Sequence, residues 1–334
     1  MSQRDLVIPL LIDGKEDNGS GTFDVISAKT GKPCWKAATA STKDAIRAVK
    51  AAENAFLSWS KTKPAEKQRI LFKVAELLES RISEYGEIMQ MEMGGDKRPV
   101  QGWVLPNSVS YLRDIASHIP VITGSVPTSG DEGMLHMHWA CELQPLQLQL
   151  FSKARNYHQD VTGHWEAGLS SGVLNIIYCK SSDSEEVVNA MIKHPAVRKV
   201  NFTGSTDVGR KVARTCGEFL KPCLMELGGK NSAIVLADAD LQDAARECII
   251  GAALHSGQIC MSTDRIIVHA DIAEDFLQIL KSTLLTLVSL APDPPYLVTA
   301  ASKSRLQELV SAALADGASC LVGGTEQLRK TEKD

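Results

Sequence analysis

The stretch Phe202-Thr-Gly-Ser-Thr-Asp-Val-Gly209 follows a predicted strand that begins at Lys199, and it leads into a helix predicted for residues 208–220. The first turn of a helix presents unpaired backbone N–H groups and the positive end of the helix dipole, which together suit an anion such as a pyrophosphate. The stretch has fewer glycines than the G-x-G-x-x-G dinucleotide fingerprint. By itself it favours an ordinary strand-to-helix turn over a cofactor loop.

Strand and helix patterns alternate from about Gly172 onward. Short apolar runs indicate buried strands, and runs with apolar residues at helical spacing lie between them. Such alternation predicts an α/β fold, with a parallel sheet and helices on its faces. The predicted elements are strands at 173–178, 199–202, 232–236 and 265–269, and helices at 184–194, 208–220 and 240–253, the last one capped by Asp240.

Helices are predicted upstream from their entry and exit signals. Ser41 with Asp44 makes a capping-box pattern before one apolar helical face, and Thr62 with Pro64 opens a second helix. Gly94-Gly95 ends the helical region that follows. The methionines just before it are interpreted as core-filling residues rather than as part of a cofactor site. They are Met89, Met91 and Met93.

Size and charge exclude some classes of protein. A chain of 334 residues with 44% hydrophobic side chains can bury one or two cores, so two domains are expected. The 36 Lys and Arg residues are scattered and are outnumbered by 40 Asp and Glu residues, giving a net charge of -4. Nucleic-acid-binding proteins usually carry a clustered basic excess, so a nucleic-acid partner is not expected.

The eight cysteines contain no C-x-x-C pair and no His-rich spacing, so neither a metal site nor a disulfide framework is expected. They are interpreted as free thiols of a reducing compartment. The apolar run at residues 6–12 is broken by Pro9 and is too short for a secretion signal or a membrane span. A cytoplasmic protein without a membrane partner is therefore expected.

Two residues could carry covalent chemistry on a carbonyl. Cys260 lies in Leu254-His-Ser-Gly-Gln-Ile-Cys-Met-Ser-Thr263, in a predicted loop between a helix and a strand. Glu226 lies in Met225-Glu-Leu-Gly-Gly-Lys230, among apolar neighbours that favour a base working near neutrality. A thiolate is a nucleophile, and neighbouring glycines let backbone approach a ligand closely. Together the two motifs predict nucleophilic catalysis.

Each motif also has a structural interpretation. Most free cysteines are small buried hydrophobes, and Cys216, Cys223 and Cys248 are assigned to that class. Glu226 alone would be interpreted as a salt-bridged residue, for instance with Lys230. A cysteine hydrolase is a further alternative, because His255 and His269 flank Cys260. It is the weaker one, since it leaves the strand-turn-helix at Gly204 unexplained and no protease signature surrounds the thiol.

The three motifs together resemble the aldehyde dehydrogenase superfamily. The resemblance implies oxidation of an aldehyde to a carboxylic acid with NAD or NADP. Cys260 would form a thiohemiacetal and then a thioester, and Glu226 would activate the water that hydrolyses the thioester. The stretch around Cys260 is similar to that of members acting on aromatic aldehydes. The residues implied to bind the cofactor are Gly204, Ser205, Thr206, Asp207, Val208, Gly209, Leu227 and Gly228.

The same resemblance implies a Rossmann-like cofactor domain at residues 1–227 and an incomplete α/β catalytic domain at 228–334. Residues 127–145 resemble the hairpin through which family members oligomerise, so a homo-oligomer is a possible assembly. At 141–165 the sequence departs from the family, which carries there a Pro-Trp-Asn segment and a Lys-Pro-Ser-Glu segment. The leucines of that segment could still form a half-buried strand.

The departures bear on activity. The missing asparagine helps to form the oxyanion hole in family members, and the missing lysine and glutamate hold the adenosine ribose. The chain also ends at Asp334, before the family's Glu-Glu-x-Phe-Gly-Pro motif. We therefore expect very weak or no dehydrogenase activity from these 334 residues. A noncatalytic relative is the alternative, and the choice between NAD and NADP stays open.

Overall fold

The computed structural model describes residues 6–95, 97–121, 148–150, 158, 162–290 and 297–323. The hairpin expected at 127–145 and most of the divergent segment 141–165 lie outside the described residues. The described chain forms two compact units, Met1–Glu226 and Leu227–Asp334. This boundary lies one residue from the expected domain boundary, whereas the roles assigned to the two domains stay predictions.

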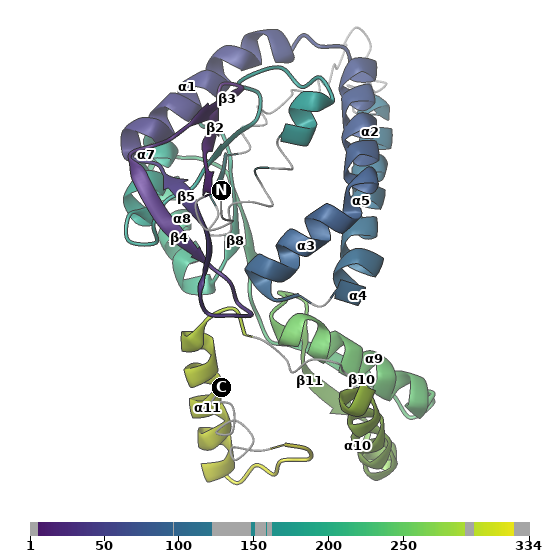
Figure 1. The fold of residues 1–334 in the computed structure, drawn as a ribbon. Coiled ribbons are helices and arrows are strands. Elements are labelled where there is room, and N and C mark those ends of the chain that lie inside the picture. The colour runs from purple at the N-terminus through teal and green to yellow at the C-terminus, as the bar shows by residue number, and fades with distance from the viewer. Residues whose placement is uncertain are drawn as a thin grey trace, which may run out of the picture. The chain divides into compact units, whose positions relative to one another are not determined.

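Two small mixed sheets organise the first unit (Figure 1). One has the order β1-β5-β4, where β5 pairs parallel with β1 and antiparallel with β4. The other has the order β3-β2-β7-β6, and in it β2 is antiparallel to both of its neighbours while β6 and β7 are parallel. The strands are β1 (Val7–Ile8), β2 (Leu10–Ile12), β3 (Lys15–Asp17), β4 (Gly21–Ile26), β5 (Pro33–Thr39), β6 (Leu148–Leu150) and β7 (Asn175–Ile177).

The main core fills the space between these strands and the helices α1 (Thr42–Trp59) and α7 (Ser184–Lys193). Its largest fully buried side chains include Trp35, Tyr178 and Ile176. α1 contributes three small residues, Ala45, Ala48 and Val49, all fully buried, so the helix can lie close to the strands. The strand expected at 173–178 is shorter in the structure, but its apolar residues from Leu174 to Tyr178 are buried as predicted.

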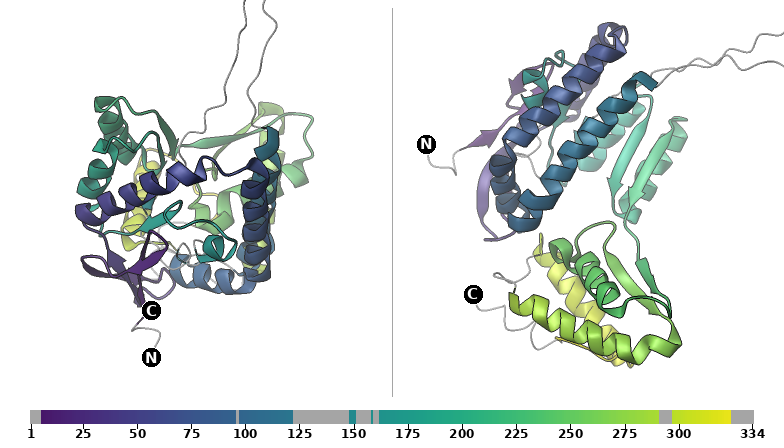
Figure 2. Two further views of the ribbon diagram at one scale, coloured as in Figure 1. Left: turned by 90° about the horizontal axis from the view of Figure 1, so that it is seen from above. Right: turned by 90° about the vertical axis from the view of Figure 1, so that its right-hand side faces the viewer.

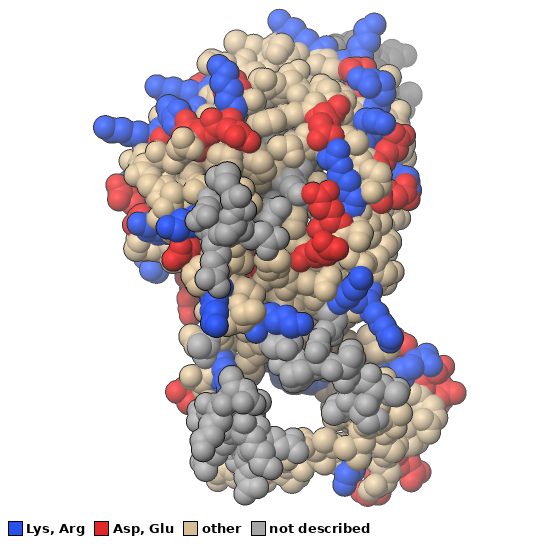
Figure 3. Space-filling view, in the orientation of Figure 1, with Lys and Arg blue, Asp and Glu red and all other residues tan. Residues whose placement is uncertain are grey.

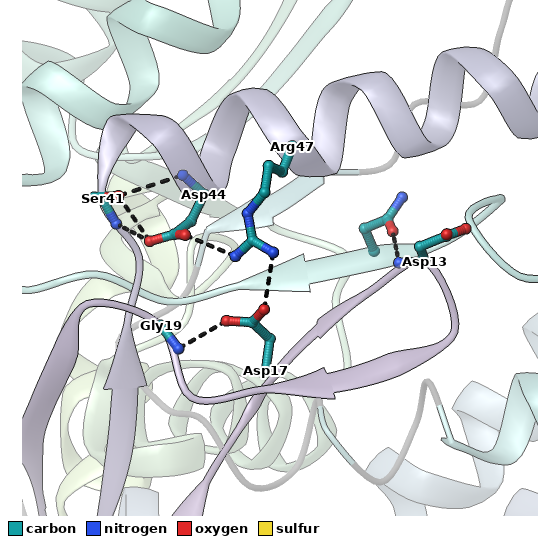
Figure 4. Close-up of polar contacts among 7 residues, drawn as sticks. Asp13, Asp17, Gly19, Ser41, Asp44 and Arg47 are labelled. Atoms are coloured by element: carbon teal, nitrogen blue, oxygen red, sulfur yellow. Dashed lines mark hydrogen bonds and ion pairs between the residues drawn. The ribbon is translucent and has the colours of Figure 1, made fainter.

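An ionic network ties the N-terminal hairpin to the start of α1 (Figure 4). The Ser41–Asp44 capping box is present, which confirms the predicted helix start. One guanidinium nitrogen of Arg47 lies 2.7 Å from Asp44 Oδ1, and the other lies 2.9 Å from Asp17 Oδ2 at the end of β3. The other oxygen of Asp17 accepts a hydrogen bond from Gly19 N. Arg47 thus links a helix cap to a hairpin turn.

A second helical layer consists of α2 (Pro64–Ser80), α3 (Ile82–Met93) and α5 (Leu105–His118), with the short helices α4 (Lys97–Pro99), η2 (Val100–Val104) and η3 (Ile119–Val121) around them. α2 and α5 lie side by side (Figure 2). Pro64 occupies the first turn of α2, as predicted, although the N-cap is Lys63 rather than Thr62. Gly94, at φ 71°, ends α3, which confirms that prediction. Met89 and Met91 pack against buried clusters.

The remaining part of the first unit is a strand-helix-strand segment. It comprises β8 (Val200–Gly204), α8 (Thr206–Glu218) and β9 (Cys223–Leu227). β8 and β9 pair with each other and form a separate two-stranded sheet among the described residues. The strands expected at 173–178 and 199–202 thus do not share a parallel sheet in the described chain, whereas β10 and β11, further along, do pair parallel. The N-terminal hairpin supplies one antiparallel partner, β2, to β7, and among the described residues β8 pairs with β9 alone.

The second unit is built on two parallel strands, β10 (Asn231–Val235) and β11 (Thr263–Val268). α9 (Leu241–Ala253) and α10 (Ala273–Leu290) cover one side of the pair, where Val235, Cys248 and Phe276 are buried. Asp240 caps α9, as predicted, through bonds to Gln242 N and Asp243 N. The other elements of this unit are η4 (Leu254–Gly257), η5 (Ala270–Ile272) and α11 (Ala300–Ala315).

Acidic and basic side chains are interspersed over the face drawn in Figure 3. Several form surface ion pairs, such as Arg113 with Glu79 and Arg81 with Glu166. None of the helices in the described ranges combines the length and the hydrophobicity needed to cross a lipid bilayer. Within the same ranges, no group of three or more His, Cys, Asp or Glu side chains could hold a metal ion.

Candidate active site

Cys260 lies in the short loop between η4 and β11, where its side chain is exposed. The loop closes on itself, because Ser262 N donates to Ile259 O at 3.0 Å and Ile259 N donates to Ser262 Oγ at 3.3 Å. Ser262 is buried, with an exposed fraction of 6%. The turn therefore has a buried anchor at Ser262 and presents the thiol of Cys260 to solvent.

Asn231, the first residue of β10, holds this loop from the neighbouring strand. Its side-chain Nδ2 donates to Cys260 O at 2.8 Å and to Ser262 O at 3.1 Å. β10 is parallel to β11, and Asn231 is in register with Thr263 just after the turn. The amide thus fixes the backbone on both sides of Met261. Sequence reasoning missed Asn231, because its role depends on the pairing of two distant strands.

The backbone before Cys260 is strained. His255, Ser256 and Gly257 all have left-handed conformations, with φ of 50°, 55° and 73°. A non-glycine residue in this region costs on the order of 1–3 kcal/mol, and such residues cluster at functional sites. Gln258 then holds the loop, because its Oε1 accepts from Val298 N and its Nε2 donates to His255 O. The surrounding contacts therefore impose a defined path on the chain that leads to Cys260.

Glu226 lies on β9 as the last residue of the first unit, whereas Cys260 belongs to the second unit. The expectation that apolar neighbours would enclose Glu226 is wrong for the described structure. Its side chain is exposed, and Leu224, two residues earlier on the same face of β9, is 47% exposed. The proposed salt bridge with Lys230 is also absent, because Lys230 Nζ lies 2.6 Å from Asp264 Oδ1. Glu226 is thus open to water.

The cysteines assigned to buried positions divide into two groups. Cys216 and Cys248 are buried, as expected. Cys223 is exposed, so that assignment is wrong for it. Its neighbours Pro222 and Leu224 are apolar, which favoured burial. In the structure, however, Cys223 begins a strand of a two-stranded sheet, and Leu224 on that strand is exposed as well. Exposure alone therefore does not distinguish Cys260 from Cys223 or Cys320.

The histidines do not favour the alternative of a cysteine hydrolase. His269 follows β11 at the end opposite Cys260, and at a strand rise of about 3.3 Å per residue it lies roughly 20 Å from the start of the strand. Its Nδ1 accepts a hydrogen bond from Asp271 N, which caps η5. His255 has the left-handed conformation described above, and its carbonyl oxygen accepts hydrogen bonds from Gln258. The His269 imidazole is therefore engaged at the cap of η5, far from the thiol.

The stretch after β8 forms the expected strand-turn-helix. Ser205 is the N-cap of α8, its Oγ accepts from Val208 N at 3.4 Å, and residues 203–208 are exposed. The helix starts at Thr206, two residues earlier than predicted. The one negative charge in its first turn, Asp207, is paired with Arg210 at 2.8 Å. This open helix N-terminus fits the phosphates of a dinucleotide.

The glycines near these elements have different environments. A Cβ added at Gly204 would lie 2.6 Å from the Phe202 ring, so a side chain there would require that ring to move. Gly209 is buried inside α8. A Cβ at Gly228 would meet nothing within 4 Å, which shows open space beside the chain after Glu226. That space is compatible with a bound ring.

Comparisons with known proteins agree with one family. The model of the Aldehyde dehydrogenase family matches residues 15–140 and 161–334. The gap, 141–160, lies inside the segment where a departure was expected. A vanillin dehydrogenase of Pseudomonas sp. strain HR199 is 35% identical and a salicylaldehyde dehydrogenase of Pseudomonas putida is 34% identical. The alignments cover 95% and 92% of this chain, and 73% and 70% of the relatives.

Solved structures give the same result. The crystal structure of a salicylaldehyde dehydrogenase from Pseudomonas putida G7 with salicylaldehyde superposes with a TM-score of 0.87 and 29% identity. The superposition covers 96% of this chain and 73% of the salicylaldehyde dehydrogenase chain. An indole-3-acetaldehyde dehydrogenase with NAD+ superposes with a TM-score of 0.84 and 25% identity, covering 95% of this chain and 71% of that one.

The chain belongs to the aldehyde dehydrogenase family, and its fold is the α/β fold of that family with a Rossmann-like cofactor-binding part. It is an oxidoreductase that converts an aldehyde to a carboxylic acid with NAD or NADP. These matches do not favour the alternative of a noncatalytic relative.

Proposed function

We propose that Cys260 is the nucleophile of this aldehyde dehydrogenase and that Glu226 is the base for hydrolysis. The observation that carries the proposal is the placement of the Cys260 thiol. It is exposed on a strained loop whose backbone Asn231 holds at two carbonyl oxygens. A fixed, accessible thiol is what attack on a carbonyl carbon requires. Buried thiols such as Cys216 lack that access.

The chemistry on the protein proceeds in two stages. The Cys260 thiolate bonds to the aldehyde carbon, whose oxygen becomes the oxyanion of a thiohemiacetal. A bound NAD(P)+ would supply the hydride acceptor, and loss of the hydride from that carbon would leave Cys260 carrying a thioester. Glu226 then takes a proton from a water molecule, whose oxygen bonds to the acyl carbon while the bond to sulfur breaks. The products are the carboxylic acid and the regenerated thiol.

We assign cofactor binding to the N-terminus of α8 and to the chain after β9. The backbone N–H groups at the start of the helix, at Ser205, Thr206 and Asp207, would bind the pyrophosphate, while those of Val208 and Gly209 donate to Ser205 and hold the turn in shape. Gly204 keeps the approach to that turn free of a side chain. Leu227 and Gly228 would lie beside the nicotinamide, where the open space next to Gly228 leaves room for it. These residues bind and orient the cofactor, and they leave bond making to Cys260.

The substrate class that we propose is an aromatic aldehyde. Relatives at 34–35% identity are named vanillin and salicylaldehyde dehydrogenases. A benzaldehyde dehydrogenase of Pseudomonas putida is 28% identical. All three names denote a benzene ring that carries the aldehyde carbon.

The test compares Cys260→Ser with Cys320→Ser, a matched change at another exposed cysteine of the second unit. Reduction of NAD or NADP is followed with benzaldehyde, salicylaldehyde and an aliphatic aldehyde of similar size. We expect Cys260→Ser to abolish turnover, Cys320→Ser to retain it, and kcat/KM to be highest for the aromatic aldehydes. Full activity of Cys260→Ser would overturn the assignment, and a preference for the aliphatic aldehyde would overturn the substrate class.

Several expectations from the sequence stay predictions. They are the weak activity caused by the departure at 141–165, a homo-oligomer, a cytoplasmic location and the lack of a nucleic-acid partner. The first is the sharpest. Loss of one oxyanion-hole donor costs on the order of a hundred- to a thousand-fold in rate. Replacing residues 141–165 by the segment of a relative should therefore raise kcat by a similar factor.

A further inference from the structure

Two cysteines flank the turn that joins α8 to β9. Cys216 lies in the last turn of α8, and Cys223 is the first residue of β9. The chain reverses between them, because Lys221 N donates a hydrogen bond of 2.9 Å to Cys216 O. Leu220 makes the reversal with a left-handed φ of 52°. The turn therefore brings the start of β9 back beside the end of the helix.

The side chains of both cysteines lie on the same side of β9. Cys216 is fully buried in a cluster with Ile192 and Val212, and Met225 of β9 packs against this cluster. Alternate residues of a strand share a face. Cys223 therefore shares the face of Met225, which is the face toward α8.

The Cys223 thiol also lies near that of Cys216. Burial, and after it the nearby Cys223 thiol, raises the pKa of Cys216 to about 11. Cys216 is thus a neutral thiol at neutral pH. Cys223 is exposed, whereas Cys216 is not. An oxidant in solution therefore reaches Cys223 first.

We propose that Cys216 and Cys223 form a reversible intramolecular disulfide when the protein meets a peroxide. In the first step, Cys223 sulfur attacks hydrogen peroxide, the O–O bond breaks, and a sulfenic acid and one water form. In the second step, Cys216 sulfur attacks the sulfur of that sulfenic acid. The S–O bond breaks, and its hydroxyl leaves as a second water with the Cys216 proton. The two thiols are oxidised, and the peroxide is reduced to two waters.

The bond would join the end of α8 to the start of β9. This link involves the helix assigned to the cofactor and the strand that carries Glu226. The proposal itself requires neither of those roles, because it depends only on the two thiols and on the turn that brings them near each other. Its failure would leave the assignment of Cys260 untouched.

The sequence makes this disulfide simple to detect. Trypsin cleaves after Arg214 and Lys230 but not at the Lys221-Pro222 bond, so residues 215–230 form one peptide that contains both cysteines. The reduced protein is treated with hydrogen peroxide, denatured, alkylated and digested without a reductant. We expect this peptide to lack both alkyl groups and to have lost the mass of two hydrogen atoms. A thiol reductant added before alkylation should restore both alkylations.

Other results would overturn the proposal. They are two alkylated cysteines after peroxide, a peptide pair that joins two protein copies, or a Cys223 sulfinic acid with Cys216 still alkylated. Two variants sharpen the test. Cys223→Ser, at an exposed position, should leave Cys216 fully alkylated after peroxide, and its circular dichroism should match that of the parent. Cys320→Ser should form the disulfide as the parent does, because it removes an exposed thiol of the other unit.

Discussion

The side-chain amide of Asn231 donates a hydrogen bond of 2.8 Å to the backbone carbonyl of Cys260, across the parallel pair of β10 and β11. A second bond from the same nitrogen reaches Ser262 O at 3.1 Å. One side chain on a strand therefore fixes both sides of the loop residue that follows the proposed nucleophile. The pairing of β10 with β11, and not the loop alone, therefore helps to fix the position of the thiol.

Asn231→Asp should lower kcat while the protein stays folded. The aspartate keeps the shape of the amide but cannot donate to the two carbonyl oxygens. A misplacement of about 1 Å can cost on the order of 100-fold in rate, so we expect a loss of about 10- to 100-fold. Steady-state kinetics measure it, with Ser232→Ala as the control at the next, exposed residue of β10. Unchanged kcat in Asn231→Asp would show that the two bonds do not position Cys260.

Cys260 should be the most reactive thiol toward a brief pulse of iodoacetamide. Burial, with a smaller effect from Asp183, raises the pKa of Cys179 to about 11, and Cys216 is raised to the same value, so both stay protonated and slow. Cys223 and Cys320 are exposed like Cys260 and are the meaningful comparison. Peptide mapping over time gives the rates. Faster alkylation of Cys223 than of Cys260 would contradict the assignment of the nucleophile.

Glu226→Gln should separate hydride transfer from hydrolysis. The amide is isosteric but cannot take the proton of water, so the thioester would persist. Provided that the parent turns over, a stopped-flow record of the variant should then show a burst of reduced cofactor, followed by turnover that is slowed about 100-fold or more relative to the parent. Glu218→Gln, at the end of α8, is the matched control and should behave as the parent. An equal loss of burst and steady rate would point to a positioning role for Glu226.

The network at Arg47 predicts a pH dependence of stability. Hydrogen bonding to Arg47 lowers the pKa of Asp17 below its usual 3.8. For Asp44, burial acts in the opposite direction, but bonds from Ser41 and Arg47 outweigh it and lower the pKa as well. A carboxyl with a lowered pKa stabilises the fold above its unfolded value and loses that contribution as the pH falls through the folded value. The free energy of unfolding should therefore fall as the pH decreases below about 3.8.

Arg47→Met tests the origin of that loss. The variant should be less stable than the parent near pH 6, and its stability should change less between pH 5 and pH 2, as expected for removal of the partner of both carboxyls. Urea unfolding at a series of pH values gives the comparison. Arg210→Met, which removes an ion pair on the exposed surface of α8, should keep the slope of the parent. The same slope in Arg47→Met would contradict the role of the network.

Local signals in the sequence predict much of the fold but less of the site. Ser41 with Asp44, Asp240 and Gly94 mark helix ends through contacts within a few residues, and the structure confirms all three. The exposure of Cys223 and of Glu226 depends on which strands pair with β9 and what covers them. The partners of β9 cannot be read from the residues around it, so the apolar neighbours of Cys223 and Glu226 wrongly predicted burial.

Asn231 illustrates the same limit at the proposed active site. Its register with Thr263 brings together two segments separated by a complete helix. No local pattern around Asn231 indicates a contact with the Cys260 loop. By contrast, the strand-turn-helix at Gly204 is local, and the structure confirms it with α8 starting two residues earlier than expected.

Direct detection of the acyl group tests the central claim, which is that the aldehyde is oxidised while bonded to Cys260. Glu226→Gln is mixed with NAD or NADP and salicylaldehyde, quenched in acid within one turnover, digested and examined by mass spectrometry. The account predicts a salicyloyl group on the peptide that contains Cys260, in an amount equal to the reduced cofactor formed. It also predicts no acyl group on Cys260 when the cofactor is omitted from the mixture. Reduced cofactor formed without an acyl group on Cys260, or with the group on another cysteine, would contradict the account.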